Sequence, residues 1–521
     1  MNGRLARSAA LIGIALVVTT NVASAATQFL WSGAVTPSSA RVKARISPDG
    51  AVARLIVSAS TDFSDPMYSS PDTALTAVNN RVVDLPITGL SPDTRYRYAL
   101  EVDGNLDTSL TGWFRTFPDS PTSFTIALGS CAQTASAHTV FTTIKDHDPL
   151  LFLHTGDFHY ENIGVNDPNV FRAAYESVLA SATQSALYRS VPIAYIWDDH
   201  DYGPNNSDST APGRTASRLT YQEYVPYYPL PAGTGDVPIY QAFDIGRVRF
   251  ILTDSRSARS PYTATDNAAK TMLGATQKAW FKQELLNSRD TYPLIVWVNT
   301  LPWIGTTGDD GWYLYTTERR EIADFLKDNG ISNICMLSGD AHMIAIDDGT
   351  NSDYATGGGA GFPVFHAAAL DRSGSTKGGP YSEGAYPGGG RFGLMTVSDS
   401  GGAWLHVLWQ GLTYTNSQLV SYSFSVPTGT IVPCDCASHG DIAGDDGAID
   451  NLDLAALIDH VFFGDAQPVT DFTCPHVDRG DIDCDGFDDA TDLAHLIDII
   501  YFGGPGPCDP CACTVYPVDC P

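Results

Sequence analysis

The sequence predicts an α/β protein whose central domain follows a small β-sandwich and precedes a short acidic module. Three observations lead to this fold class. Residues 122–427 alternate short apolar runs with helical stretches, residues 27–117 contain only strand-like segments, and residues 434–521 contain a duplicated acidic segment. At 521 residues the chain is long enough for roughly two or three domains.

The composition argues against a nucleic-acid-binding groove and is compatible with an exported protein. The formal net charge is −29, whereas such a groove needs Lys and Arg gathered on one face. The acidic residues are unevenly spread, because residues 434–521 hold 19 Asp, no Glu and one basic residue, Arg479. An acidic surface is also common in soluble exported proteins.

Residues 1–25, "MNGRLARSAALIGIALVVTTNVASA", have the pattern of a secretory signal peptide. Arg4 and Arg7 precede an apolar stretch, and small residues up to Ala25 predict cleavage after that residue. No later segment reaches the roughly 20 apolar residues that cross a bilayer. We therefore expect a secreted, periplasmic or cell-surface protein. Eight of the ten cysteines lie in residues 434–521, as expected for disulfides in an oxidising compartment.

Residues 27–117 predict a β-sandwich, because segments such as "FLWSGAVTPSSARVKARIS" and "RYRYALEVDG" alternate apolar and polar residues between turns. Residues 118–121, rich in Pro, Asp and Ser, predict a linker. In residues 122–427, apolar runs such as "FTIALGS", "LLFLHTG" and "LIVWVN" predict buried strands. The stretches "ATQKAWFKQELLNS" and "TERREIADFLKDNG" predict helices between some of those strands.

Several of these predicted strands end at residues that are able to bind a metal ion. These residues are Cys131, Asp157 with Tyr160, Asp198, Asp199 and His200, Asn299, and Asp340 with His342. Each motif alone has a plainer explanation as a turn or a structural side chain. Ligands of open α/β sheets gather beyond the carboxyl ends of strands, so together these residues predict a metal site there. Bound cations would compensate the adjacent carboxylates of the "DDHD" segment, in which Asp198 and Asp201 are expected to hold the loop.

The motifs resemble those of the PhoD-type alkaline phosphatases, within the calcineurin-like metallophosphatases. The resemblance rests on residues 129–131 (GSC), 156–160 (GDFHY), 197–201 (WDDHD) and 339–342 (GDAH), with two further stretches at 251–259 and 273–281. It covers about residues 27–427. It implies a fibronectin III-like β-sandwich over residues 27–117, followed by a four-layer α/β/β/α metallophosphatase sandwich over residues 122–427.

The resemblance also implies a set of ligands. Cys131, Asp157, Tyr160 and His342 would hold Fe(III), since tyrosinate is a hard ligand that suits a ferric ion. Asp157 would bridge to a second site, completed by Asp199, Asp340 and Asn299, for Ca(II) or another divalent ion. An activated water would then attack phosphorus, and His200 would donate to a phosphate oxygen or to the leaving group. Arg256 is a further candidate for binding phosphate oxygens.

Residues 440–464 and 480–503 are two copies of one segment, which resembles the dockerin type I repeat. In the second copy, the spacing of an EF-hand loop selects Asp481, Asp483, Asp485, the carbonyl of Phe487, and Asp492 as calcium ligands. The looser first copy keeps Asp441, Asp445 or Asp446, and Asp453. Residues 434–521 are thus predicted to form a small helical domain with structural Ca(II), and a cohesin-like or cell-surface partner is implied.

The leading interpretation is a secreted metal-dependent phosphoesterase, similar to alkaline phosphatase D, that hydrolyses phosphate mono- or diesters and is tethered by the C-terminal module. A phospholipase- or nucleotidase-like esterase on the same site and a non-catalytic surface adhesin are the alternatives. An inactive copy should have lost at least one metal ligand, which argues against an adhesin. Cys131 has a competing explanation, a disulfide to Cys335, although Cys335 falls within a predicted strand and two separate thiols are favoured.

Overall fold

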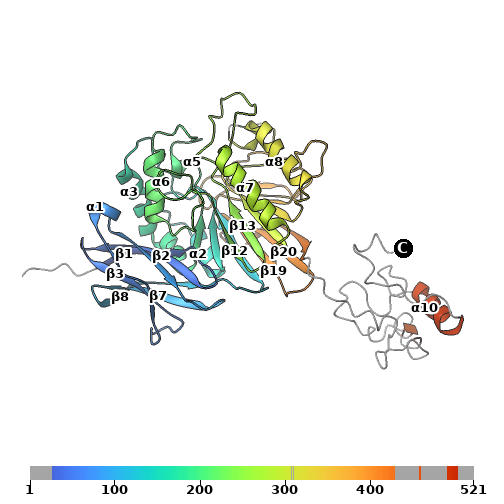
Figure 1. Ribbon diagram of the computed structural model, residues 1–521, viewed down its shortest axis with the longest axis horizontal. Helices are drawn as coiled ribbons and strands as arrows, with labels where there is room; N and C mark the ends of the chain where they lie inside the picture. Colours follow the sequence, from blue (N-terminus) through green and yellow to red (C-terminus); the bar gives the residue numbers. More distant parts are fainter. Residues whose placement is uncertain are drawn as a thin grey trace, which may run out of the picture. The chain divides into compact units, whose positions relative to one another are not determined.

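The structure is a computed structural model that describes residues 26–428, except 307 and 309, and residues 454, 457, 458 and 490–502. The chain divides into two compact units, one of residues 1–401 and 405–426 and the other of residues 402–404 and 427–521 (Figure 1). The predicted signal peptide and most predicted calcium ligands lie outside the described residues. Those calcium ligands are Asp441, Asp446, Asp453, Asp481, Asp483, Asp485 and Phe487.

A nine-stranded sheet runs through the larger unit. Its strands, in order, are β21 (Gln418–Pro427), β20 (Trp404–Thr413), β19 (Arg391–Ser398), β9 (Phe124–Gly129), β10 (Leu151–His154), β11 (Ile193–Tyr195), β1 (Ala26–Gly33), β2 (Ser39–Ser47) and β6 (Val82–Thr88). Strands β9, β10 and β11 are parallel, and β1 continues them through a parallel pairing of Gly33 with Ile193. The sheet therefore crosses the expected boundary between the two N-terminal regions.

A seven-stranded sheet packs against the first. Its strands, in order, are β12 (Gln241–Ile245), β13 (Val248–Leu252), β14 (Leu294–Val298), β15 (Ile334–Ser338), β17 (Val364–Ala367), β16 (Met343–Asp347) and β18 (Ala385–Pro387). The side chains of β14 alternate between two cores. Val296 belongs to the core shared with the nine-stranded sheet, whereas Trp297 packs with α7 (Gly274–Arg289) and α8 (Thr316–Asp328). Burial on both faces explains why these strands read as continuous apolar runs.

The remaining helices of this unit border the nine-stranded sheet and the loops beyond it. They are α1 (Thr76–Asn79), α2 (Val140–Asp146), α3 (Pro168–Ala180), α4 (Ala182–Ser190), α5 (Asp199–Tyr202), α6 (Arg214–Tyr224) and the short 3₁₀ helix η1 (Trp312–Leu314). In Figure 1, α3 and α6 lie side by side, and α7 and α8 lie together on the other side of the sheets. The structure is thus a mixed α/β fold built on several sheets, as the sequence predicts.

A third sheet belongs to the predicted β-sandwich. It contains β4 (Met67–Tyr68), β3 (Val52–Ser58), β7 (Arg95–Val102) and β8 (Asn105–Arg115), and β5 (Asp72–Thr73) pairs with β3. Its partner layer is the β1–β2–β6 edge of the nine-stranded sheet. Trp31 on β1 is fully buried and lies 5.5 Å from the ring of Phe158, measured between centroids. The sandwich is therefore packed against a residue that directly follows the candidate ligand Asp157.

The C-terminal unit has a small apolar cluster drawn from both copies of the repeat. Leu457 and Leu496 are buried, and Leu454, Leu493, Ile499 and Ile500 pack around them. In the second copy, residues Ala490–Ile497 form α10, which contains the predicted calcium ligand Asp492, and a π-helical turn (Asp498–Phe502) follows. None of the helices among the described residues is long and apolar enough to cross a membrane.

Candidate metal centre

The centre lies where strands of both large sheets end. Cys131 follows β9, Asp157 follows β10, Asp199 opens α5 after β11, and Asp340 follows β15 of the second sheet. The backbone of Cys131, Asp157 and Asp340 is left-handed, with φ of 63°, 55° and 67°. Such angles are uncommon for residues other than glycine and often mark functional sites. Tight turns thus hold three predicted ligands at the strand ends.

The predicted site consists of seven metal ligands and His200. The structure brings all of these residues together except Asn299. Three groups each have ligand atoms within 4.8 Å of one another: Cys131–Asp157–His342, Asp157–Asp199–His200 and Asp198–Asp199–Asp340. The hydroxyl of Tyr160 lies 2.9 Å from Nε2 of His342. Asp157 belongs to two groups, which is the arrangement that a bridging ligand requires.

Three oxygen atoms of the buried carboxylates accept no hydrogen bond from the residues that the structure describes, and Nη2 of Arg256 lies 3.7 Å from one of them, Oδ1 of Asp199. Oδ2 of Asp157, Oδ2 of Asp198 and Oδ1 of Asp199 are buried and have no hydrogen-bond partner. Burial, followed by repulsion from Asp199 and Asp198, raises the pKa of Asp157 well above its usual value. Burial also raises the pKa of Asp340 to about 6. Because buried charges are costly without a partner, this oxygen-rich arrangement fits bound cations.

The donors at the other end of the centre suit a different metal. Nδ1–H of His342 donates to the carbonyl oxygen of Ser373 at 2.6 Å, which leaves the lone pair of Nε2 for a ligand. Burial, followed by the charge of Asp157, raises the pKa of both the Cys131 thiol and the Tyr160 hydroxyl. Deprotonation of these groups therefore needs a nearby cation. Sulfur, phenol and imidazole donors together fit a transition metal such as iron.

His200 faces Asn162 and Tyr160 beside these groups. Its Nδ1 lies 2.7 Å from Oδ1 of Asn162, and its ring stacks on Tyr160 with 3.9 Å between centroids. Burial lowers the pKa of His200, as do the charges of Arg256, Arg372 and Lys377, whereas Asp199 raises it. With Nδ1–H donating to the amide oxygen, Nε2 is the atom left to exchange a proton.

The structure corrects the predicted role of Arg256. Its guanidinium is fully buried and bonds through Nε to Asp198 at 2.6 Å, through Nη1 to the carbonyl of Ser207 at 3.3 Å, and through Nη2 to Asp310 at 2.8 Å. Burial lowers its pKa, but Asp198 and Asp310 outweigh burial and raise it. Arg256 therefore neutralises internal carboxylates and has no free edge for substrate.

Asn299 is also committed elsewhere. Its amide oxygen accepts hydrogen bonds from Ser255 and from Trp312, each at 3.1 Å, and its Nδ2 donates to the carbonyl of Leu301 at 2.5 Å. Both lone pairs of the amide oxygen are thus used within the protein. The structure places Asn299 next to the second sheet's strand ends but not among the free donors.

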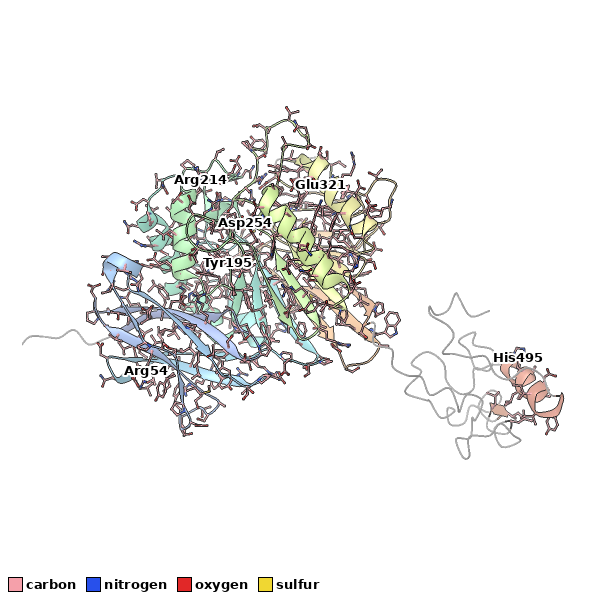
Figure 2. The ribbon with its side chains drawn as sticks, viewed as in Figure 1. Arg54, Tyr195, Arg214, Asp254, Glu321 and His495 are labelled. Carbon is pink, nitrogen blue, oxygen red and sulfur yellow. The ribbon has the colours of Figure 1, made fainter. Side chains whose placement is uncertain are left out.

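The acidic loop around the centre is held as the sequence predicts. Asp201 accepts hydrogen bonds from the backbone N–H of Asp198 at 2.7 Å and of Phe158 at 2.9 Å, and from the hydroxyl of Tyr195. Asp254 accepts from Nε1 of Trp197 at 2.9 Å and from the N–H of Arg256 at 3.0 Å. Figure 2 labels Tyr195, the last residue of β11, and Asp254, which follows β13, near the middle of the larger unit.

Four residues of this region were not predicted from the sequence: Asn162, Asp310, Arg372 and Lys377. Asp310 lies 2.8 Å from Arg256 and 2.5 Å from Arg259. Nζ of Lys377 lies 2.9 Å from both carboxylate oxygens of Asp340. None of the four directly follows a strand, so the strand-end pattern gave no signal for them. The competing disulfide is excluded, since Cys131 and Cys335 are both free and buried.

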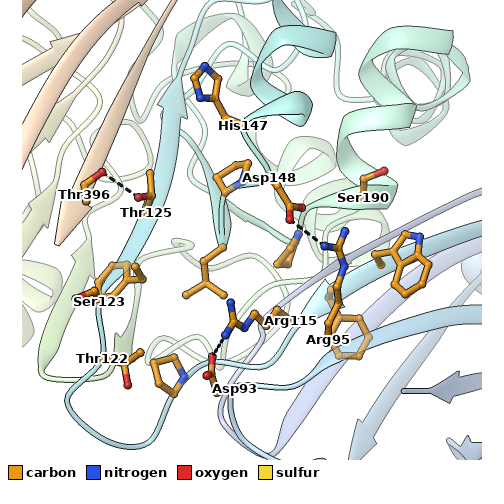
Figure 3. A pocket seen from close by; sticks show the side chains of 17 residues that line it. Asp93, Arg95, Arg115, Thr122, Ser123, Thr125, His147, Asp148, Ser190 and Thr396 are labelled. Carbon is orange, nitrogen blue, oxygen red and sulfur yellow. Dashed lines mark hydrogen bonds and ion pairs between the residues drawn. The ribbon is translucent and has the colours of Figure 1, made fainter. Parts of the chain in front are cut away.

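A cavity of about 520 Å³ lies at the opposite ends of the parallel strands (Figure 3). It is lined by Phe124 at the start of β9 and by Arg95 and Arg115 of the β-sandwich. Arg95 pairs with Asp148 at 2.9 Å, and Arg115 pairs with Asp93 at 2.7 Å. None of the predicted metal ligands lines it, so this cavity is separate from the metal centre.

Comparisons with known proteins relate the chain to phosphatases. Residues 126–379 match the family of PhoD-like phosphatases. The chain is 25% identical over 313 residues to alkaline phosphatase D of Bacillus subtilis (strain 168), an alignment that covers 50% of this chain and 53% of the relative. It is 24% identical over 271 residues to purple acid phosphatase 13 of Arabidopsis thaliana, covering 46% of each.

The fold comparison reaches further along the chain. A solved structure of PhoD matches with a TM-score of 0.63 at 18% identity, covering 76% of this chain and 89% of that one. The shared fold therefore includes more than the residues of the family match. The chain spans about half the length of the two curated relatives that it matches.

Proposed function

We propose that the protein, whose residues 126–379 form a PhoD-like phosphatase domain, is a metal-dependent phosphoesterase. One observation carries the proposal. Buried carboxylates with unpartnered oxygen atoms converge at the strand ends with a thiol, a phenol and an imidazole. A solvated acidic turn would not bury Asp157 and Asp199 to 1% and 2% exposure without hydrogen-bond partners for both oxygens. A relic of an enzyme would not be expected to retain every one of these groups.

The donor set supports two different cations. Cys131, Asp157, Tyr160 and His342 would hold the iron, and Asp157, Asp199 and Asp340 would hold calcium or another divalent ion. Bound cations lower the pKa of a water ligand and neutralise phosphoryl oxygens. This division follows the chemistry of the donors, because sulfur and phenol lie at one end and carboxylates at the other.

His200 is the residue that we assign to proton transfer. Its Nδ1–H donates to Asn162, which fixes the ring, and Nε2 then exchanges a proton with the phosphate or the leaving alcohol. Burial and nearby cations keep the free ring neutral at pH 7. The negative charge of a phosphate ester raises the pKa of such a ring, so substrate binding favours the protonated form that can donate.

Secretion and tethering belong to the same proposal. The signal-peptide pattern of residues 1–25 supports export. The apolar cluster of Leu457 and Leu496 joins the two copies of the C-terminal repeat, as expected if they form one dockerin-like module with structural Ca(II). A cohesin-like or cell-surface partner for this module remains part of the proposal.

The proposal is tested by hydrolysis of p-nitrophenyl phosphate and of bis(p-nitrophenyl) phosphate by the full chain with Fe and Ca supplied. We expect Asp157→Asn and His200→Asn to lower turnover at least about 100-fold. The exposed Asp328→Asn is the matched control and should keep full turnover. No turnover of either ester by a protein that has bound both metals would contradict a general phosphoesterase. That result would favour a selective esterase or a non-catalytic adhesin.

A further inference from the structure

The loop of residues 371–377, between β17 and β18, is tied to the candidate metal ligand His342. The backbone N–H of His342 donates to Oγ of Ser375 at 3.3 Å, and the N–H of Ser375 donates to the carbonyl of His342 at 3.1 Å. The carbonyl of Ser373 accepts from the imidazole of His342 at 2.6 Å. These bonds fix the loop beside the metal centre, although its sequence "DRSGSTK" has no regular secondary structure.

Two cations of this loop face the centre. The guanidinium carbon of Arg372 lies 4.1 Å from the centroid of the Tyr160 ring, and one of its terminal N–H groups bonds to the side chain of Gln133. Its Nε is buried and has no hydrogen-bond partner within the described part of the chain. Lys377 uses two N–H donors on Asp340, which leaves its third for another group. Both side chains are partly exposed, so they are open to a ligand from solution.

The contrast with Arg256 decides which cations can meet a substrate. Arg256 is 0% exposed, and its guanidinium is held inside the protein by Asp198, Asp310 and Ser207. The Lys377 side chain is 25% exposed. An oxyanion that enters from solution beside Tyr160 and His200 would therefore meet Arg372 and Lys377, and it would not meet Arg256.

We propose that residues 371–377 form a phosphate-binding loop, in which Arg372 and Lys377 bind the non-bridging oxygens of a phosphate monoester. This inference rests on the proposed function and adds its substrate class. A monoester has three terminal oxygens and carries up to two negative charges, whereas a diester has two terminal oxygens and one charge. Two cations in addition to bound metals therefore favour the monoester. Charge-assisted bonds to phosphate oxygens are among the strongest hydrogen bonds in proteins.

The test uses the full chain loaded with Fe and Ca, and inorganic phosphate as the probe. Arg372→Ala and Lys377→Ala are compared with Arg320→Ala, an exposed arginine of α8. Titration calorimetry gives the Kd for phosphate, elemental analysis gives the metal content, and thermal unfolding checks the fold. We expect each loop variant to raise the Kd about 10- to 100-fold at unchanged metal content, and the control to match the wild type.

Turnover distinguishes monoesters from diesters. We expect Arg372→Ala to lower kcat/KM for p-nitrophenyl phosphate several-fold more than for the bis ester, and Arg372→Lys to restore part of the loss. An unchanged Kd in both loop variants overturns the proposal. A loss of metal that parallels the loss of phosphate binding also overturns it, because the loop would then support the metals rather than the substrate.

The same experiment separates this inference from the proposed function. If the wild type hydrolyses both esters and the loop variants bind phosphate as tightly as it does, the loop assignment fails and the phosphoesterase stands. If the wild type hydrolyses neither ester but binds phosphate, and the loop variants bind phosphate more weakly than the wild type does, the phosphate-binding loop stands. In that case the catalytic proposal and the assignment of a monoester substrate both fail.

Discussion

At the residue scale, the contact between His200 and Asn162 sets what the imidazole can do. The 2.7 Å bond holds the ring from Nδ1, and stacking on Tyr160 limits its rotation. Neither contact is visible in the sequence, because Asn162 follows the GDFHY motif in a loop without regular structure. Under the proposed function, Asn162 is therefore assigned as a positioning residue that acts through His200.

We predict that Asn162→Ala lowers kcat about 10-fold with little change in KM, because the ring loses the bond that orients it. Asn162→Asp keeps an acceptor for Nδ1–H and adds a negative charge, which should raise the pKa of His200 and shift the pH profile upward. Steady-state kinetics across pH 5–10 check both variants. An unchanged profile in Asn162→Asp would show that Asn162 does not act through His200.

Arg256 supports a prediction about stability. Replacing it by Met leaves Asp198 and Asp310 buried without their shared partner, so we expect a loss of about 3–5 kcal/mol in the free energy of unfolding. Urea unfolding measures this loss, with Arg320→Met as the surface control. Normal stability combined with weak phosphate binding would instead restore the role that the sequence suggested for Arg256.

The strand-end residues could be predicted because their signal is local. An apolar run followed by Gly-Asp or Asp-Asp-His places a side chain at the carboxyl end of a strand, wherever that strand lies in the sheet. The errors at Arg256 and Asn299 have a different origin. Their roles depend on Asp310 and Trp312, which are brought near by folding and belong to segments without strand-end motifs.

At the element scale, the glycines before the ligands allow the strand ends to approach each other. A Cβ on Gly156 would lie 2.4 Å from Cβ of Asp198, and one on Gly339 would lie 2.6 Å from the carbonyl of Thr155. Gly156 also has a φ of 102°, which side chains rarely adopt. The turn after β10 thus needs glycine both for close contact and for its backbone conformation, and the turn after β15 needs it for close contact.

We predict that Gly156→Ala and Gly339→Ala each destabilise the protein by about 2 kcal/mol or more and reduce metal content, since the ligand-bearing turns must move apart. Gly164→Ala is the control, because its added Cβ would lie 3.7 Å from the nearest side chain, an ordinary contact. Thermal unfolding and elemental analysis measure the two effects. Full metal content in both variants would contradict this account of the turns.

The β2–β6 pair contains a titratable contact far from the metal centre. Asp84 accepts bonds from Arg41 at 2.7 and 2.5 Å and lies 3.1 Å from Nζ of Lys43. Burial raises the pKa of Asp84, but Arg41 and Lys43 together outweigh burial and lower it below its usual value of 3.8. A lowered native pKa stabilises the folded state above the usual value, and this stabilisation is lost as the pH falls through the native pKa.

We predict that Asp84→Asn costs about 2 kcal/mol of stability at pH 7, since Lys43 loses the partner of its buried charge. The difference from the wild type should shrink as the pH falls from 3.8 through the lower native pKa, at which the folded wild-type carboxylate becomes protonated. Denaturant unfolding at pH 7, 5 and 3 measures it. A difference that grows toward acid pH would mean that the native pKa is raised.

Most elements were predictable from periodicity, and their pairing was not. The two amphipathic segments became α7 and α8, and α8 ends just before Gly330 as its stop signal indicates. The pairing of β1 with β11 joins Gly33 to Ile193. No sequence pattern selects that partner. A strand with alternating apolar and polar residues is able to pair either with an edge strand of the central sheet or within a second sheet of the sandwich.

At the scale of the whole molecule, the N-terminal strands complete the central sheet. Trp31 is fully buried, donates from Nε1 to the carbonyl of Tyr224 at 3.0 Å, and packs on Phe158 and Tyr188. Phe158 follows Asp157 directly. The β-sandwich and the metal centre are therefore connected through one aromatic cluster, and the sandwich is not an independent attachment.

We predict that Trp31→Ala lowers the free energy of unfolding by about 3–5 kcal/mol and lowers metal affinity as well. Removal of the indole leaves an empty space beside Phe158, in the turn that carries Asp157. Trp113→Ala, on β8 and only partly buried, is the control and should leave metal affinity unchanged. Denaturant unfolding and metal titration measure the two quantities. Wild-type metal affinity in Trp31→Ala would show that the sandwich and the centre are uncoupled.

The left-handed backbone of Cys131, Asp157 and Asp340 has a consequence for how this protein can be changed. Each such angle costs about 1–2 kcal/mol in a residue with a Cβ, and glycine would remove most of that cost. A search for heat-resistant variants that scores only survival on heating should therefore favour glycine at these three positions. Every such variant would lose a proposed metal donor, so the simplest gains in stability would come at the expense of the proposed activity.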